Sequence, residues 1–257
     1  MLLSNRVAII TGGARGIGRA IALKFAEEGS SIVIADVTEK SARQTVDEIS
    51  KLGRQALFVS CDVSNSQQVQ AMAKQTIDRF GKIDILVNNA GTGAFPRPIA
   101  EVSEAEWDRT LSINLKGVFL CCQAVTPYMK AQRYGKIINM SSIGAISPVS
   151  PVSYNSSKGG VMTLTIDVAM EMAPYNICVN AIMPGLTRTE MVDEFAPSGI
   201  NKDEYYDQLG KTLVPMQRVG KPQDIAGAAL FLASNLSDYV TGDRIIVAGG
   251  APWRAHL

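Results

Sequence analysis

The stretch Val7-Ala8-Ile9-Ile10-Thr11-Gly12-Gly13-Ala14-Arg15-Gly16-Ile17-Gly18 decides the fold. Its first four residues are all apolar, which is typical of a parallel strand covered on both faces. A glycine-rich turn follows, and a helical pattern then runs from about Ile17 to Gly29. Glycines let the backbone approach a pyrophosphate closely, and a helix N-terminus offers free N–H groups to an anion. The stretch therefore predicts a strand, a phosphate-binding loop and a helix in succession.

The alternation of strand and helix continues along the chain. Short apolar runs rich in β-branched residues alternate with longer segments of helical period. Seven strands and six helices predict one α/β domain over residues 1–257, with a Rossmann-like, doubly wound, parallel seven-stranded sheet and helices on both faces. Segment 189–215 is more polar and less regular, and we expect it to be a mobile substrate lid. The expected strands are residues 7–10, 32–35, 56–59, 83–87, 136–139, 177–182 and 244–247, and the later helices lie at about 67–80, 104–130, 154–172 and 224–232.

Composition excludes several classes of function. The 25 Lys and Arg residues nearly balance the 24 Asp and Glu residues, so an electrostatic grip on nucleic acid or an anionic membrane is not expected. No apolar run approaches the ~18 residues that span a bilayer, and the first residues lack a signal-peptide pattern. The four cysteines form no CxxC pair, which suits a reducing compartment, and we expect a cytoplasmic protein. The only histidine, His256, leaves no basis for a His-rich zinc site or a Ser-His-Asp triad, and no metal is expected.

Asp36 ends the second expected strand, 18 residues after Gly18. A carboxylate there can accept hydrogen bonds from both ribose hydroxyls of an adenosine and would repel a 2′-phosphate, so NAD is favoured over NADP. A helix-capping or turn residue is the alternative interpretation of this aspartate. Arg15 is an opposing signal, because a basic side chain in the loop could meet a 2′-phosphate. We give Asp36 more weight because it lies nearer the ribose in this architecture.

Tyr154 and Lys158 are four residues apart, and such residues share one face of a helix. An ammonium beside a phenol favours the phenolate and lowers the tyrosine pKa from its ordinary ~10, so Tyr154 could exchange a proton near neutral pH. The spacing alone also suits an ordinary amphipathic helix. Ser141 lies 13 residues before Tyr154 at the end of a strand, where its hydroxyl could bind a substrate oxygen. Ser142 is the competing choice, and the spacing prefers Ser141.

Together these motifs resemble the short-chain dehydrogenase/reductase family over nearly the whole chain. Thr11 to Gly18 is similar to the TGxxxGxG loop of that family, and Asn88-Asn89-Ala90-Gly91 is similar to its NNAG motif. Ala248 stands where many members have an aspartate, which is a departure outside the chemistry. The other matches are the adenine-contacting pair Asp62-Val63, the catalytic set Asn114, Ser141, Tyr154 and Lys158, the Pro184-Gly185 motif, and Thr187 and Thr189 near the nicotinamide.

The resemblance implies a role for each member of the catalytic set. Tyr154 would be the general base in alcohol oxidation and the general acid in ketone reduction, while Lys158 would lower its pKa and bind the nicotinamide ribose. Ser141 would polarise the substrate carbonyl. Asn114 would hold a water that links Lys158 to solvent, because its amide can both donate and accept. The cofactor-binding residues implied by the resemblance are Gly12, Arg15, Gly16, Ile17, Gly18, Asp36, Asp62, Val63, Asn89, Tyr154, Lys158, Pro184, Thr187 and Thr189.

The expected reaction is the NAD-dependent interconversion of a secondary alcohol and its ketone. An apolar pocket wall suits a hydrophobic small-molecule substrate, although apolar lining is the rule for most pockets. The residues expected to form this wall are 93–96, 143–152, Met191, Phe195 and Tyr205.

Two alternatives for the function stay open. A β-hydroxyacyl-CoA or acyl-carrier dehydrogenase or 3-oxoacyl reductase would admit a long carrier arm, and Arg97, Lys202 and Lys211 are compatible with it. A non-catalytic subunit that binds NAD and scaffolds a partner is less favoured, because such subunits tend to lose one member of the catalytic set.

The resemblance also implies a homotetramer, in which the helices at 104–130 and 154–172 pair with their copies. The tail carries Trp253 and Arg254, which could reach a neighbouring subunit, although a solvated terminus is the more ordinary interpretation.

Overall fold

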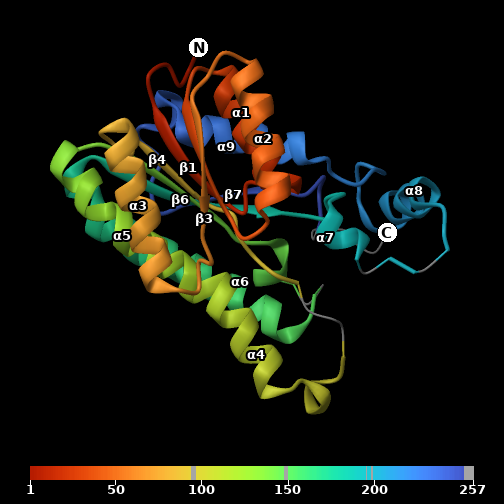
Figure 1. Cartoon of the computed structure of the whole chain (residues 1–257). Helices are drawn as coiled ribbons and strands as arrows, with labels where there is room; N and C mark the ends of the chain where they lie inside the picture. Colours follow the sequence, from red (N-terminus) through yellow and green to blue (C-terminus); the bar gives the residue numbers. More distant parts are fainter. Residues whose placement is uncertain (94–96, 148–149, 195, 198, 252–257) are drawn as a thin grey trace.

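One parallel sheet of seven strands forms the centre of the computed structural model of the chain (Figure 1). The structure describes residues 1–93, 97–147, 150–194, 196–197 and 199–251. The strand order is β3-β2-β1-β4-β5-β6-β7, and each neighbouring pair is parallel. The predicted Rossmann-like, doubly wound sheet is therefore confirmed. The strands are β1 (Val7–Thr11), β2 (Ser31–Asp36), β3 (Ala56–Ser60), β4 (Ile85–Asn88), β5 (Gly135–Met140), β6 (Ile177–Pro184) and β7 (Arg244–Val247).

Helices cover both faces of the sheet. Helices α1, α2 and α9 pack on one face, and α3, α5 and α6 pack on the other (Figure 1). Short turns of 3-10 helix follow or precede several of these elements. The helices are α1 (Gly16–Glu27), α2 (Glu39–Lys51), α3 (Ser66–Phe80), α4 (Glu104–Leu111), α5 (Gly117–Gln132), α6 (Val152–Met172), α7 (Glu190–Asp193), α8 (Lys202–Leu213) and α9 (Pro222–Ala233), with the 3-10 turns η1 (Ile99–Glu101), η3 (Ile143–Ala145), η4 (Ala173–Tyr175) and η5 (Asn235–Ser237).

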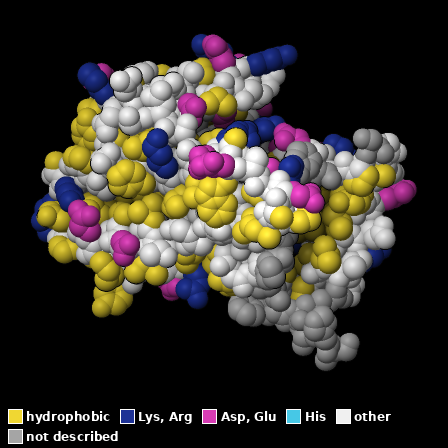
Figure 2. All heavy atoms as spheres, turned by 90° about the horizontal axis from the view of Figure 1, so that it is seen from below, with side chains coloured by type: hydrophobic (Ala, Val, Ile, Leu, Met, Phe, Trp, Pro, Cys, Tyr) yellow, Lys and Arg dark blue, Asp and Glu magenta, His cyan; other side chains and the backbone are white. Residues whose placement is uncertain are grey.

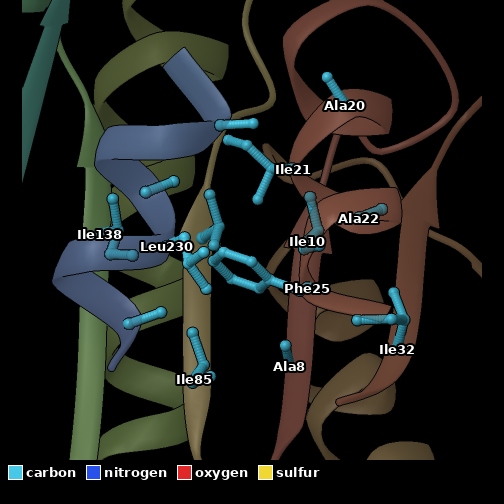
Figure 3. Packing of buried hydrophobic residues seen from close by; sticks show 14 of the residues in the cluster. Ala8, Ile10, Ala20, Ile21, Ala22, Phe25, Ile32, Ile85, Ile138 and Leu230 are labelled. Carbon is cyan, nitrogen blue, oxygen red and sulfur yellow. The ribbon is translucent and has the colours of Figure 1, made fainter. Parts of the chain in front are cut away.

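The core explains why the strands are continuous apolar runs. All residues of β1 are buried, because the sheet is covered on both sides. On one face, Ile21 and Phe25 of α1 lie between Ile10 of β1 and Leu230 of α9 (Figure 3). Burying one such side chain stabilises the fold by roughly 1.5–3 kcal/mol. These contacts hold the first turn of α1 in place over the end of β1.

The strand order reverses between β1 and β4, where the chain crosses from one half of the sheet to the other. In open parallel sheets the crevice at such a switch point, beyond the carboxyl ends of the strands, is the usual ligand site. The residues that follow β1, β2, β4, β5 and β6 therefore converge on one edge of the sheet.

Two helical segments differ from the prediction. The helix expected at 104–130 is α4 and α5 joined by a π-helical turn, η2 (Ser112–Lys116). Segment 189–215, expected to be irregular, contains α7 and α8. Its polar residues are those of exposed helices; Asn201, for example, caps α8 by accepting from the N–H groups of Asp203 and Glu204. Whether the segment moves as a lid stays a prediction. None of the described helices has the length and apolar character required to cross a bilayer.

Candidate functional site

The glycine loop joins β1 to α1, and its glycines fix its shape. Gly12 and Gly16 adopt φ angles of +63° and +56°, a region that side chains rarely tolerate. A Cβ on Gly18 would collide with the main-chain oxygen of Gly12, so glycine there lets α1 pack directly on the loop. Ile17 packs against the core beside them.

Asn89 braces this loop from the end of β4. Its Nδ2 donates to the main-chain oxygens of Thr11 at 3.0 Å and Gly12 at 2.9 Å. The Thr11 hydroxyl accepts in turn from the N–H groups of Asn89 and Ala90, each at 3.0 Å. The segment after β4 is therefore tied to the end of β1 at the switch point, and both hydrogens of the Asn89 amide are committed to that role.

Asp36 lies at the carboxyl end of β2, and its carboxylate touches the glycine loop. Oδ2 accepts from the N–H of Ala14 at 3.0 Å, and Oδ1 accepts from the N–H of Thr38 at 2.9 Å. Each oxygen keeps capacity for a further donor. Val37 follows, with 69% of its surface exposed, so an apolar side chain stands open beside the carboxylate. Val37 is not among the residues predicted from the sequence, although its position directly after Asp36 was the available signal.

Asp62 and Val63 shape the loop that follows β3. Oδ1 of Asp62 accepts from the N–H and the hydroxyl of Ser64 at 2.9 and 2.7 Å, while its own N–H donates to Oε1 of Gln68. Val63 is buried against Gly117 of α5, where a Cβ would lie 2.7 Å from the Val63 side chain. Contact of this pair with an adenine stays a prediction.

Helix α6 carries Tyr154 and Lys158 at the end of β5. The Lys158 ammonium nitrogen lies 5.6 Å from the centroid of the Tyr154 ring and donates to the main-chain oxygen of Met140 at 2.7 Å. Burial lowers the pKa of Lys158 to about 8. Burial raises the pKa of Tyr154, and a hydrogen bond to Ser142 opposes that rise in part.

The expected lowering of the Tyr154 pKa by Lys158 is therefore not found in the protein itself. Desolvation of the phenol is the largest cause of its pKa shift, and it favours the neutral form. Burial also disfavours protonation of the Lys158 amine, because desolvation lowers the pKa of Lys158. The spacing of two residues along a helix does not show how deeply they are buried. The effect of burial on the two pKa values could therefore not be predicted from the sequence.

The structure separates the two serines at the end of β5. The Ser141 hydroxyl donates to the main-chain oxygen of Lys158 at 2.9 Å. Ser142 accepts at Oγ from the N–H of Gly144 at 3.1 Å, and its hydroxyl lies close enough to the Tyr154 phenol to lower the pKa of that phenol. Ser142, the alternative to Ser141 as the serine of the site, therefore lies at the Tyr154 phenol. The predicted Ser141 instead donates its proton to a main-chain oxygen of α6. Consecutive residues of an extended chain point to opposite sides, so a spacing argument cannot separate them.

Asn114 sits inside the π-helical turn η2 and is fully buried. Its Oδ1 accepts from the N–H of Thr92 at 2.8 Å, and its Nδ2 donates to the main-chain oxygen of Thr92 at 3.0 Å and to the Ser157 hydroxyl at 3.1 Å. A Cβ on Gly91 would lie 3.2 Å from the Asn114 Oδ1 and 3.7 Å from the Lys158 Nζ, so these groups are neighbours. Both amide hydrogens are therefore donated within the protein, and the expectation that Asn114 holds a relay water stays a prediction.

The segment after β6 reaches the glycine loop from the other side. Pro184 ends β6, and the Thr187 hydroxyl donates to the main-chain oxygen of Gly185 at 3.0 Å. Thr189 caps α7, and its Cγ2 would lie 3.5 Å from a Cβ on Gly16. Thr189 and the start of α1 therefore face each other across the crevice.

The three basic residues offered as contacts for a carrier arm are each paired with a carboxylate. Arg97 lies 3.5 Å from Glu106, Lys202 lies 2.9 Å from Asp193, and Lys211 lies 2.6 Å from Asp207. Exposed pairs of this kind contribute only up to about 1 kcal/mol, so these three pairs do not by themselves identify an anion site. Residues 94–96, 148–149 and 195 of the expected pocket wall, and the tail residues Trp253 and Arg254, lie outside the described residues.

The loops after β1 and β2 carry donors and acceptors suited to a nicotinamide dinucleotide. In the described part of α1, the N-cap Arg15 makes no side-chain capping bond and the first turn holds no acidic residue, so its N–H groups suit a phosphate. Asp36 offers carboxylate oxygens beside the exposed Val37, as a ribose and an adenine would need. The residues present therefore fit the cofactor.

Known proteins similar to this chain are reductases and dehydrogenases. Residues 12–252 match the family model described as enoyl-(acyl carrier protein) reductase. The chain is 43% identical over 253 residues to (2S)-[(R)-hydroxy(phenyl)methyl]succinyl-CoA dehydrogenase subunit BbsD of Thauera aromatica, covering 97% of this chain and 98% of that protein. It is 40% identical to 3-oxoacyl-[acyl-carrier-protein] reductase FabG of Staphylococcus aureus, covering 96% and 98% of the two chains. The crystal structure of levodione reductase superposes with a TM-score of 0.91 at 33% identity, covering 96% of this chain and 98% of that one.

Proposed function

The chain belongs to the short-chain dehydrogenase/reductase family of oxidoreductases, and we propose that it interconverts a secondary alcohol and its ketone with NAD as the preferred cofactor. The observation that carries the proposal is the cluster of Ser142, Tyr154 and Lys158 at the carboxyl end of β5. This cluster lies next to Gly91, on the loop that also braces the glycine turn through Asn89.

Each residue of the cluster has a distinct task in this proposal. Tyr154 takes the hydroxyl proton of an alcohol and returns a proton to the oxygen of a ketone. Ser142 donates a hydrogen bond to that same oxygen: its Oγ accepts from the Gly144 N–H, and its hydroxyl proton turns from the Tyr154 phenol to the bound substrate. The bound nicotinamide supplies or accepts the hydride.

In this proposal Lys158 places its positively charged ammonium close to the phenol of Tyr154. Of its three ammonium hydrogens, one is used on Met140, which leaves two for a ribose hydroxyl or a water. In this proposal the charged Lys158 stabilises the phenolate that forms when Tyr154 gives up its proton to the substrate oxygen. Asn114 keeps the loop at Thr92 in register with α6, because both hydrogens of its amide are donated to Thr92 and Ser157. A relay water would therefore need donors and acceptors other than these two amide hydrogens.

The remaining cofactor residues have proposed places along the dinucleotide. Asp36 accepts from the adenosine ribose, and the N–H groups at the start of α1 face the pyrophosphate. The set proposed to contact the cofactor comprises Gly12, Arg15, Gly16, Ile17, Gly18, Asp36, Asp62, Val63, Asn89, Tyr154, Lys158, Pro184, Thr187 and Thr189, with Val37 added beside the adenine.

A second candidate function is the oxidation of a β-hydroxyacyl thioester or the reduction of a 3-oxoacyl thioester. The printed names of two relatives favour it, since BbsD is a dehydrogenase of a CoA thioester and FabG is a reductase of an acyl-carrier thioester. Both candidates use the same cluster, because a thioester substrate of this class also carries a secondary alcohol or a ketone. They differ in whether the enzyme recognises the carrier arm.

The proposal is tested with a panel of secondary alcohols and their ketones, followed by the absorbance of reduced nicotinamide. Turnover of free alcohols and ketones with NAD supports the first candidate. A kcat/KM that is higher by orders of magnitude for CoA thioesters than for the matching free ketones supports the second. Tight NAD binding with no turnover of any substrate in the panel would instead indicate a non-catalytic scaffold.

We also propose that the chain assembles as a homotetramer through α5 and α6. The outer faces of these helices leave Phe119, Tyr128, Ile166 and Met170 from 36% to 61% exposed. Hydrophobic side chains are spread over the face seen from below in Figure 2, with charged groups scattered among them. A second copy of the same helices would cover such a surface. The four cysteines are free and buried, as suits the expected cytoplasmic location.

A further inference from the structure

The basic side chain of the glycine loop is engaged by the segment after β6. Arg15 is the N-cap of α1, and its Nη1 lies 3.3 Å from Oε1 of Glu194, at the C-terminal end of α7. About half of each side chain is exposed. The preceding residue, Ala14, donates its N–H to the Asp36 carboxylate, so Arg15 is next in the chain to the point where the ribose is proposed to bind.

Glu194 is held in this position by contacts within its own segment. Its N–H donates to the main-chain oxygen of Glu190, which continues the turn of α7. Asp193, one residue earlier, accepts from the Tyr206 hydroxyl at 2.7 Å and lies 2.9 Å from the Lys202 ammonium. These bonds tie α7 to α8, so the carboxylate that meets Arg15 is presented from a braced helix end.

The neighbouring arginines on the same side of the sheet are also paired with glutamates. Arg19 of α1 forms an ion pair with Glu48 of α2, and Arg43 of α2 lies 2.7 Å from Glu39. Helix α2 itself packs on the glycine loop, since the Thr45 hydroxyl donates to the main-chain oxygen of Ala14. Arg19 and Arg43, like Arg15, therefore already have acidic partners.

Resting on the proposed function, we propose that Glu194 is a second determinant of cofactor choice, because its pairing with Arg15 withholds that guanidinium from the 2′-phosphate of NADP. Asp36 repels the phosphate directly, and Glu194 removes the group best suited to compensate for it. The arrangement differs from repulsion alone, because it predicts a latent NADP site that a single neutral substitution exposes. Arginine binds phosphate through paired N–H donors, so a freed Arg15 has a defined partner.

The test is the affinity of the full chain for NAD and for NADP, measured by titration calorimetry without substrate. Glu194→Gln should tighten NADP binding by about twofold to fivefold at low ionic strength and change NAD binding by a smaller factor. The gain should shrink as salt is added, since the pair is exposed. The same titrations in an Asp36→Ala background, where NADP binding is stronger, should show the same direction of change.

Two further variants distinguish pairing from a general change of charge. Adding Arg15→Ala to Glu194→Gln should remove the gain for NADP. Glu27→Gln is the matched control, because Glu27 also lies 3.3 Å from its basic partner, Lys24, and is 52% exposed against 58% for Glu194. Unchanged NADP affinity in Glu194→Gln, a gain that survives the loss of Arg15, or an equal gain in Glu27→Gln overturns the inference. Failure of the unmutated chain to bind NAD would overturn the proposed function instead.

Discussion

The hydroxyl of Ser142 faces the phenol of Tyr154 across the loop that joins β5 to α6 and lowers the pKa of that phenol. The adjacent Ser141 instead donates its proton to the main-chain oxygen of Lys158. Two neighbouring serines of the same chemistry therefore have different tasks, one at the proposed reacting oxygen and one in the anchoring of α6.

This difference predicts opposite outcomes for two alanine substitutions. Ser142→Ala should lower kcat by about 10²–10³-fold with little change in the free energy of unfolding, since it removes one donor to the reacting oxygen. Ser141→Ala should leave kcat within a few-fold and lower the free energy of unfolding by about 1 kcal/mol, the contribution of one buried hydrogen bond. Steady-state kinetics and urea titrations measure both effects. The reverse pattern would return the polarising role to Ser141.

Tyr154→Phe should lower kcat by about 10²–10⁴-fold and leave NAD affinity near that of the unmutated protein, because only the titrating oxygen is lost. Burial raises the pKa of Tyr154, so the reactive phenolate gains population as the pH rises. The rate of alcohol oxidation should therefore climb toward alkaline pH, while ketone reduction, which needs the protonated phenol, should not. Retained turnover in Tyr154→Phe would remove this residue from its proposed role.

Lys158 should destabilise the fold at neutral pH while serving the reaction. Its pKa is lowered from 10.5 to about 8 by burial, so the unfolded chain binds more protons than the folded one between these values. The contribution of Lys158 to the free energy of unfolding is highest above pH 10.5, the pKa of the lysine in the unfolded chain. It decreases as the pH falls from about 10.5 to about 8 and is constant at lower pH. Lys158→Met should thus raise the free energy of unfolding at pH 7 by on the order of 2–3 kcal/mol and abolish turnover.

The stabilisation by Lys158→Met should shrink by about half when the comparison moves from pH 7 to pH 9.5. Lys130→Met supplies a control from the surface, where the ammonium pairs with Glu171. A Lys158→Met variant that is less stable than the unmutated chain at pH 7 would show that the hydrogen bond to Met140 outweighs desolvation.

Asp36→Ala should weaken the preference for NAD over NADP by about tenfold or more, because a carboxylate no longer repels the 2′-phosphate. The ratio of kcat/KM for the two cofactors measures this effect. Asp36 also accepts from Ala14 and Thr38, so Asp36→Asn, which keeps an acceptor of the same size, separates the loss of charge from the loss of loop support. Equal use of both cofactors by the unmutated enzyme would contradict the charge argument.

Light scattering should give the mass of four chains for the purified protein. Phe119→Asp should shift that mass to a smaller species, since it places a charge on the proposed α5 interface. Leu52→Asp is the matched control, because Leu52 has the same 45% exposure but lies at the end of α2. A monomer in the unmutated protein, or equal dissociation by both variants, would exclude assembly through α5.

Much of the fold was readable from local pattern. The apolar run at residues 7–10 is typical of a strand buried on both faces, and the positive φ of Gly12 and Gly16 is the conformation that glycines permit. The helical segment at 104–130 was located correctly, but the π-helical turn that interrupts it was not predicted. The π turn around Asn114 depends on the bonds to Thr92 and Ser157, which are distant in sequence.

By itself the sequence determined the order of strands and helices, the glycine loop, and the spacing of Tyr154 and Lys158 on one helix, because these features depend on residues near each other in the chain. Only the tertiary structure decided that Ser142 meets the phenol, that burial raises the pKa of Tyr154, and that Glu194 engages Arg15. Burial and charge pairing depend on which segments pack against a side chain in the folded protein. Arg15 and Glu194 are 179 residues apart, so no local sequence pattern predicts that they meet.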